Sequence, residues 1–183
     1  MHNKKYKETY RELSHGTDME SATIIRNNGF KISERSDSWC GPGIYFYDIK
    51  KKAWWAARRK CSEIKKETGK KVEPTVLFAD IIDIETDKIF DLRAYKDLCD
   101  FEITPLLGEY SFELSVMNET EKIIQLRSLF ISYYAEKNDK KLIIGNFRQR
   151  PQPMYEHAIE FSNSLDMIFG IETIYCVKDS NII

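Results

Sequence analysis

The sequence predicts an α+β fold in a single domain. Segments with strand-like patterns outnumber segments with helical periodicity, yet both are well represented, and the strand-like segments follow one another closely. This spacing favours mainly antiparallel pairing over the regular strand–helix alternation of a parallel sheet. The chain has 183 residues, of which 42% are hydrophobic and 31% charged. That is enough for one globular domain with one core.

The first elements lie close together near the N-terminus. Residues 1–10 are polar, basic and tyrosine-bearing, and we expect a loose arm or a short helix there, with 11–14 leading into the first strand. Residues 22–25 carry apolar side chains at helical spacing, and Gly29 is expected to end that helix. After a polar loop, a glycine turn at 41–43 enters an aromatic strand.

A longer helix is expected at 50–67. Asp48 is positioned to cap its first turn, and Gly69 follows its last turn as a typical C-terminal glycine. Apolar side chains recur at spacings of three and four on one side of this helix: Ala53, Trp54, Ala57, Cys61 and Ile64. The pattern predicts an amphipathic helix packed on the sheet.

The remaining elements are predicted from apolar runs and the breakers between them. Further strands are expected at 75–84, 88–92, 141–147, 155–161 and 171–177. Further helices are expected at 95–107, 120–137 and 163–169, and the stretch of about 94–137 is interpreted as a helical insert. Five of the side chains expected in the core are Trp54, Phe78, Ile81, Ile144 and Ile174.

Composition limits the classes of partner and compartment. The net charge of −1 predicts neither a nucleic-acid nor a membrane partner, and no apolar run approaches the roughly 18 residues of a membrane span. The N-terminus lacks a signal-peptide pattern, so a cytoplasmic protein is expected. The four cysteines have no CxxC spacing and are expected to be reduced, and no metal site is expected: Cys40, Cys61, Cys99 and Cys176.

The charge is unevenly distributed. Ten basic residues fall between positions 50 and 71: Lys50, Lys51, Lys52, Arg58, Arg59, Lys60, Lys65, Lys66, Lys70 and Lys71. Trp54 and Trp55 are interleaved with them. Aromatic and basic side chains together suit nucleic acid, whereas the plainer interpretation is a solvated helix face. Both interpretations stay open from the sequence.

Two short motifs carry the chemistry of this chain. His15-Gly16-Thr17 comes directly after the first strand-like segment. Gly41-Pro42-Gly43-Ile44-Tyr45-Phe46 comes about 25 residues later, after an apolar helix that ends in Gly29-Phe30. The ordered set resembles the ADP-ribosyltransferase superfamily, in particular the branch similar to the catalytic domain of poly(ADP-ribose) polymerases. The resemblance covers the first third of the chain well and the last strands faintly.

The resemblance implies a fold and a substrate. The fold would be two small, mainly antiparallel sheets that form a cleft for NAD, flanked by helices. His15 would bind a hydroxyl of the adenosine ribose, and Gly16 would let the backbone approach the nicotinamide amide. Thr17 would bond that amide or start a turn. Tyr45 would stack on the nicotinamide, with Tyr47, on the same side of the strand, in reserve.

The family's second stacking tyrosine aligns with Ala56, so Trp55 or Trp54 is the candidate substitute. Each of these side chains also has a structural interpretation: His15 as a buried, hydrogen-bonded histidine, and the aromatic residues as core.

A carboxylate completes the expected site. Breaking the bond between ribose and cationic nicotinamide needs no proton on the leaving group, but it builds positive charge on the ribose. A carboxylate placed at that charge accelerates the reaction. The stretch 154–161 resembles the family's glutamate strand, and Glu156 is the first choice. Glu160 and then Glu172 are the alternatives.

The implied function is mono-ADP-ribosyl transfer from NAD to a macromolecular acceptor, protein or nucleic acid. A compact domain of this composition is similar to bacterial toxins and anti-phage effectors, for which an antitoxin partner is possible. One alternative is a catalytically silent module that binds NAD or ADP-ribosylated ligands. Another is an NAD glycohydrolase, which uses water as the acceptor. The sequence leaves the acceptor open.

Overall fold

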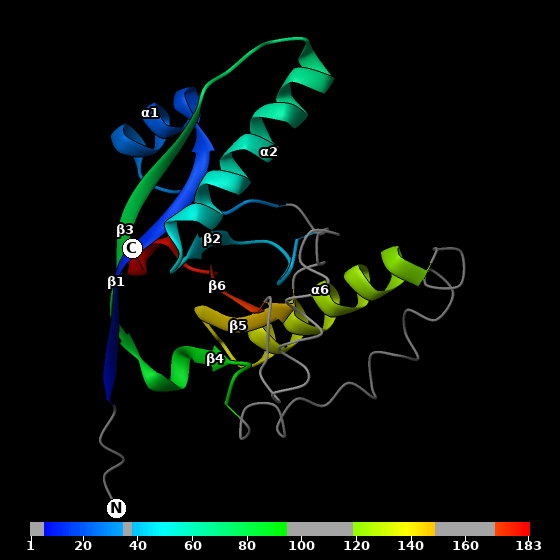
Figure 1. Ribbon diagram of the computed structural model, residues 1–183. Helices are drawn as coiled ribbons and strands as arrows, with labels where there is room; N and C mark the ends of the chain where they lie inside the picture. Colours follow the sequence, from blue (N-terminus) through cyan, green and yellow to red (C-terminus); the bar gives the residue numbers. More distant parts are fainter. Residues whose placement is uncertain (1–5, 35–37, 95–118, 149–170) are drawn as a thin grey trace, which may run out of the picture.

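The computed structural model describes residues 6–34, 38–94, 119–148 and 171–183 (Figure 1). The fold is α+β, as predicted, and is built on one mixed six-stranded sheet. The strands are β1 (Lys7–Asp18), β2 (Ile44–Tyr47), β3 (Pro74–Glu85), β4 (Ile89–Asp91), β5 (Leu142–Arg148) and β6 (Ile171–Val177). The helices are α1 (Met19–Asn28), α2 (Lys50–Thr68) and α6 (Glu119–Lys137), with short 3-10 turns at Thr86–Lys88 and Ser180–Ile182.

The sheet has the strand order β3-β1-β2-β6-β5-β4, and every neighbouring pair is antiparallel except β4 with β5. β1 pairs along its length with β3, but it joins β2 only where Ser14 faces Tyr47. The prediction of two separate sheets is therefore wrong. The two halves are continuous through this one junction, where the Ser14 hydroxyl also donates to the Tyr47 carbonyl at 2.8 Å.

Alternate side chains of β2 pack into two different hydrophobic clusters, one on each face of the sheet. Ile44 and Phe46 belong to the first cluster, whereas Tyr47 belongs to the second and Tyr45 packs against it. This alternation confirms the predicted phase of the strand. α2 and α6 contribute Ala53, Ile131 and Ala135 to the second cluster. Helices thus cover the face that carries Tyr45 and Tyr47.

α2 lies very close to β1. A Cβ built on Gly16 would be 1.9 Å from the backbone oxygen of Ala53 and 2.8 Å from the backbone nitrogen of Ala57. Both alanines are fully buried. Only glycine on the strand and small residues on the helix allow this approach, so the glycine of the His-Gly-Thr motif is required for packing.

The C-terminal ends of α1 and α2 were predicted correctly, whereas the N-cap of α2 was not. Gly29 and Gly69 end α1 and α2 with φ of 76° and 72°, as predicted. The prediction that Asp48 caps α2 is wrong, because the N-cap is Ile49 and no side chain bonds there. The backbone carbonyl of Ile49 instead accepts from Lys52 at 2.8 Å.

Two strand predictions are corrected by tertiary pairing. Residues 7–10, expected as an arm or short helix, extend β1 because Lys7 and Glu8 pair with the end of β3. Phe78, expected in the core, is 55% exposed. β3 is an edge strand whose inward-facing side chains are Leu77 and Ile81. Phe78 therefore points to the other side.

Three of the other four core predictions are confirmed. Ile81, Ile144 and Ile174 are buried, as predicted, and Trp54 is only half-buried. The strands at 75–84 and 171–177 and the helix at 120–137 are confirmed within a residue or two. The expected elements at 95–107, 155–161 and 163–169, and much of the predicted insert 94–137, lie outside the described residues. Within the described ranges, no helix has the length and apolarity to cross a membrane.

Candidate functional site

His15 lies on β1, one residue beyond the junction with β2. Its Nδ1 is 2.8 Å from the backbone carbonyl of Tyr45. A carbonyl oxygen can only accept, so Nδ1 carries the proton in this bond. This contact also explains why the ladder between β1 and β2 is so short, because the imidazole occupies a carbonyl that a longer ladder would pair with backbone.

The protonation state of His15 follows from its surroundings. Burial lowers the pKa of His15 below its usual value of 6.5, and the nearby Lys60 charge acts in the same direction. The bond to the Tyr45 carbonyl favours the charged form but does not outweigh burial. At neutral pH the ring is therefore neutral with its proton on Nδ1. Nε2 is left as a hydrogen-bond acceptor, which suits a ligand hydroxyl.

Two phenylalanines hold the imidazole in place. Phe30 contacts His15 edge-to-face with ring centroids 5.3 Å apart, and Phe46 lies 5.6 Å away. Phe30 and Phe46 also contact each other at 5.2 Å. Both come from segments of the sequence motifs, the Gly29-Phe30 pair and the Ile44-Tyr45-Phe46 strand. Their shared contact with His15 could not be predicted from the sequence, because it depends on how β1, β2 and the end of α1 come together.

Tyr45 is tied to the glycine turn that precedes it. Its hydroxyl accepts from the backbone N–H of Cys40 at 2.9 Å and donates to the carbonyl of Gly41. Burial raises the pKa of Tyr45 well above its usual range, so the phenol stays neutral. Gly41 has φ of 74°, and a Cβ there would lie 2.0 Å from the Ser132 hydroxyl of α6. The turn and the tyrosine thus fix each other.

The structure brings His15 and Tyr45 together, but through a backbone group. Their strands are neighbours, and the imidazole bonds the tyrosine's carbonyl. The His15 ring lies against Phe46 of the first cluster, whereas the Tyr45 ring packs against the second. The two side chains therefore flank β2 from opposite faces of the sheet. Glu156 and Glu160, the first choices for the carboxylate, lie outside the described residues.

Glu172, the remaining carboxylate candidate, lies on β6 and forms an ion pair with Lys52 of α2 at 2.6 Å. It lies two residues before Ile174 on β6 and so shares the face of the second cluster with it. Tyr47 is buried on the same face, and burial, followed by the Glu172 charge, raises the pKa of Tyr47 to about 12. Tyr47 therefore contributes to the core, and Glu172 lies beside it, paired with Lys52.

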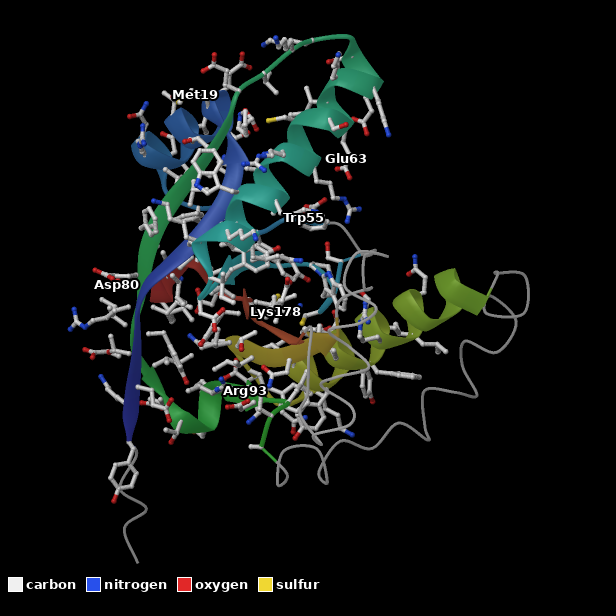
Figure 2. All side chains as sticks on the ribbon, in the orientation of Figure 1. Met19, Trp55, Glu63, Asp80, Arg93 and Lys178 are labelled. Carbon is white, nitrogen blue, oxygen red and sulfur yellow. The ribbon has the colours of Figure 1, made fainter. Side chains whose placement is uncertain are left out.

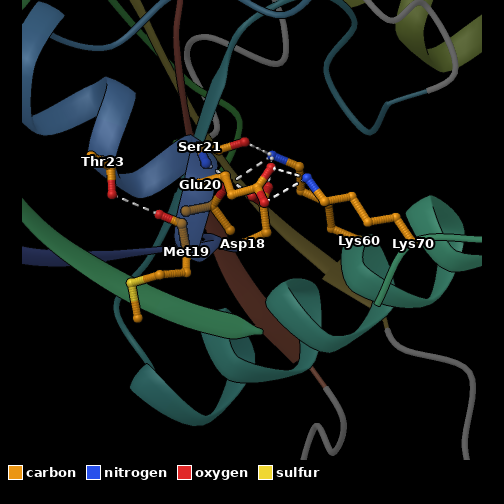
Figure 3. Close-up of polar contacts among 8 residues, drawn as sticks. Asp18, Met19, Glu20, Ser21, Thr23, Lys60 and Lys70 are labelled. Carbon is orange, nitrogen blue, oxygen red and sulfur yellow. Dashed lines mark hydrogen bonds and ion pairs between the residues drawn. The ribbon is translucent and has the colours of Figure 1, made fainter. Parts of the chain in front are cut away.

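Thr17 and Lys60 belong to a polar cluster at the start of α1 (Figure 3). The Lys60 ammonium is 2.8 Å from the Thr17 hydroxyl, 3.0 Å from the Ser21 hydroxyl and 2.9 Å from Asp18. An ammonium has three donors, so these contacts use all of them. The Thr17 hydroxyl is thus engaged inside the protein. The sequence analysis did not single out Lys60, because its partners lie about 40 residues away.

Asp18 links this cluster to the helix. It accepts from the backbone N–H of Ser21 at 2.9 Å and so caps α1. Burial on its own raises the pKa of Asp18, but the bonds from Ser21 and Lys60 outweigh burial and hold that pKa below its usual range. The carboxylate is therefore ionised at neutral pH, and it anchors α1 to α2.

Trp55 lies on the outward side of α2 and is 46% exposed. Its ring contacts are with its own helix, since the Lys52 ammonium lies 4.3 Å and the Arg59 guanidinium 5.7 Å from the ring centroid. Figure 2 shows Trp55 and Glu63 on the side of α2 that faces away from β1 and β3. The ring is accessible to a flat ligand, but its recorded neighbours do not include His15 or Tyr45.

The cysteines within the described ranges are free, as expected. Cys40 and Cys176 are fully buried beneath Tyr45, and their thiols contact each other. Burial raises the pKa of the Cys40 thiol, to which Cys176 adds. Lys178 donates to the carbonyl of Cys40 at 2.7 Å and so closes the turn from below. These residues support Tyr45. Among the described residues, no group of three or more His, Cys, Asp or Glu is arranged to hold a metal ion.

Comparisons with known proteins add no relative to this picture. No protein-family model matches the chain, and the searches of curated proteins and of solved structures also found no match.

Proposed function

We propose that this protein is an NAD-dependent mono-ADP-ribosyltransferase that transfers ADP-ribose to a macromolecular acceptor, protein or nucleic acid. The observation that carries the proposal is the state of His15. The ring is neutral, its proton is held on Nδ1 by the Tyr45 carbonyl, and Nε2 can accept from a ribose hydroxyl. Among the described residues, no hydrogen bond to Nε2 is recorded. Tyr45 lies on the neighbouring strand β2, and its backbone carbonyl holds the His15 ring.

The proposed reaction uses binding and charge rather than acid catalysis. His15 holds the adenosine ribose and Tyr45 provides a flat surface for nicotinamide. The bond between the ribose C1′ and the nicotinamide nitrogen breaks, and its electron pair leaves with nicotinamide. The acceptor's nucleophile then bonds to C1′ and releases its proton. Glu156 would stabilise the positive charge on the ribose between these events.

The test separates rate from binding. The ribose carries little charge in bound NAD and much in the transition state, so a carboxylate there contributes mainly to the rate. Glu156→Gln should keep NAD affinity within a few fold and lower transfer by roughly 100-fold or more. Tyr45→Ala removes a contact made in both states, so NAD affinity itself should fall. Calorimetric titration with NAD and transfer of labelled ADP-ribose measure the two effects.

Glu160→Gln and Glu172→Gln are the matched controls for the carboxylate. Full transfer by Glu156→Gln, with loss in one of these two, would move the role to that residue. Full transfer by all three would refute the mechanism. NAD binding without transfer or nicotinamide release would identify a silent binding module, and nicotinamide release without labelled acceptor would identify a glycohydrolase. Protease or nuclease treatment of the labelled product distinguishes protein from nucleic-acid acceptors.

A further inference from the structure

One side of α2 carries a row of basic side chains on the surface. At 100° per residue, nine side chains of α2 fall within about 80° of the direction opposite the buried Ala53 and Ala57. Three of them are Lys52, Ser62 and Glu63, and we call the other six the outer stripe: Lys51, Trp55, Arg58, Arg59, Lys65 and Lys66. All six are exposed. The acidic residues of α2 are Glu63, which lies on this side and pairs with Arg59, and Glu67, which lies beyond its edge.

Three cations near the stripe have acidic partners, as does one of the five cations within it. Lys52, Lys60 and Lys70 pair with Glu172, Asp18 and Glu20, respectively. Within the stripe, Arg59 pairs with Glu63 at 2.9 Å. Among the described residues, no carboxylate pairs with the other stripe cations, which are Lys51, Arg58, Lys65 and Lys66. The chain as a whole has a net charge of −1, so this is a local concentration of positive charge.

The stripe has the length of a polyanion site. Lys51 and Lys66 are 15 residues apart on one helix, and a rise of about 1.5 Å per residue places them roughly 22 Å apart along its axis. That length is several times the spacing of successive phosphates of one strand, which is about 3.4 Å along the axis of a duplex. A stripe of this kind can contact several phosphates of one chain at once.

Trp55 makes nucleic acid a better fit to the stripe than other polyanions. Its ring is 46% exposed and lies between Lys51 and Arg58 along the stripe. An accessible indole beside cations that can hold phosphates suits a stacked base, which an acidic peptide lacks. A membrane surface is a poorer fit, because a helix that lies on lipid needs a broad apolar face. The apolar face of α2 is already packed on the sheet through Ala53 and Ala57.

We infer that the outer stripe of α2 binds single-stranded nucleic acid, with phosphates on Lys51, Arg58, Lys65 and Lys66 and a base stacked on Trp55. The inference concerns binding alone, and it holds whether or not the protein transfers ADP-ribose. The proposed contacts are with phosphates and a base, which RNA and DNA share. Binding of an RNA and of a DNA oligonucleotide is therefore compared to distinguish the two.

The experiment measures fluorescence anisotropy of labelled 12-nucleotide RNA and DNA of mixed sequence, without NAD, over a range of salt concentrations. Four phosphate contacts should give a slope of log affinity against log salt of about −2.8, since each single-strand contact contributes about −0.7. Arg58→Gln with Lys65→Gln should reduce the slope to about −1.4. At 0.1 M salt those two contacts correspond to about 25-fold in affinity.

The matched control removes the same charge elsewhere. Lys7→Gln with Arg26→Gln changes two exposed basic residues on β1 and α1, and it should leave the affinity and the slope within twofold. Trp55→Leu should weaken binding about fivefold or more at every salt concentration, because stacking does not depend on counterion release. Thermal unfolding of each variant checks that it is folded.

Three results would overturn the inference. One is no binding at 50 mM salt with about 50 μM protein. Another is an equal loss of affinity in the Lys7/Arg26 control, which would indicate non-specific charge attraction. The third is equal binding of polyglutamate or of anionic phospholipid vesicles, insensitive to Trp55→Leu. NAD affinity of the Arg58/Lys65 variant, measured by calorimetry, should stay unchanged, so failure of the stripe and failure of the transferase proposal are distinguishable.

Discussion

Gly16→Ala is the substitution whose effect the structure predicts most directly. The added Cβ would lie 1.9 Å from the backbone oxygen of Ala53. Real Cβ atoms essentially never come closer than 3.0 Å to another heavy atom, so strand and helix must separate by at least about 1.1 Å. The obstacle is helix backbone, which has no rotamer with which to yield. We expect a loss of stability on the order of 3 kcal/mol, at the upper end of overpacking costs.

The measurement is thermal unfolding in the absence of NAD, which isolates packing from ligand binding. For a chain of this length, 1 kcal/mol corresponds to roughly 2–4 °C, so the unfolding temperature should fall by about 6–12 °C. Gly69→Ala is the matched control. Gly69 has φ of 72° and open space around it, so alanine there costs only the left-handed backbone strain of about 1 kcal/mol.

An unfolding temperature of Gly16→Ala that is no lower than that of Gly69→Ala would refute this reasoning. It would mean that β1 and α2 are not held at the described distance. The glycine of the motif would then have to be explained by the ligand alone, as the sequence analysis supposed.

Two further predictions follow from burial. His15 has a lowered pKa, so its contribution to stability is complete above about pH 6.5 and is lost as the pH falls through the folded-state value. The free energy of unfolding should therefore decline between pH 7.5 and 5 more steeply in the native protein than in His15→Gln, by at most about 1.4 kcal/mol per pH unit. Parallel urea-unfolding profiles for the two would contradict this. Ile144→Ala should cost about 2–5 kcal/mol, because Ile144 is fully buried. Phe78→Ala should cost less than about 1 kcal/mol, because Phe78 is 55% exposed. Chemical denaturation measures both, and similar losses would show that the assigned face of β3 is wrong.

Much of the candidate site could be predicted from local sequence. The two glycine motifs gave the positions of His15 and Tyr45, and the alternation of β2 gave the faces of their neighbours. The partners could not be predicted in this way. The contacts of Phe30 with His15 and of Lys60 with Thr17 join segments that are 15 and 43 residues apart. No local pattern encodes such contacts, because they depend on how strands and helices are brought together.

By itself, the sequence determined the spacing of the apolar residues in each element and the positions at which the helices end. Gly29 and Gly69 end their helices because a residue with positive φ is needed there, and this requirement is local. Only the tertiary structure decided the course of the first residues and the role of Gly16. β1 extends back to Lys7 because β3 offers a pairing edge. Gly16 must be glycine because α2 crosses it. Strand pairing and helix approach are set by residues distant in the chain, so the physical reason for each appears only once the sheet is assembled.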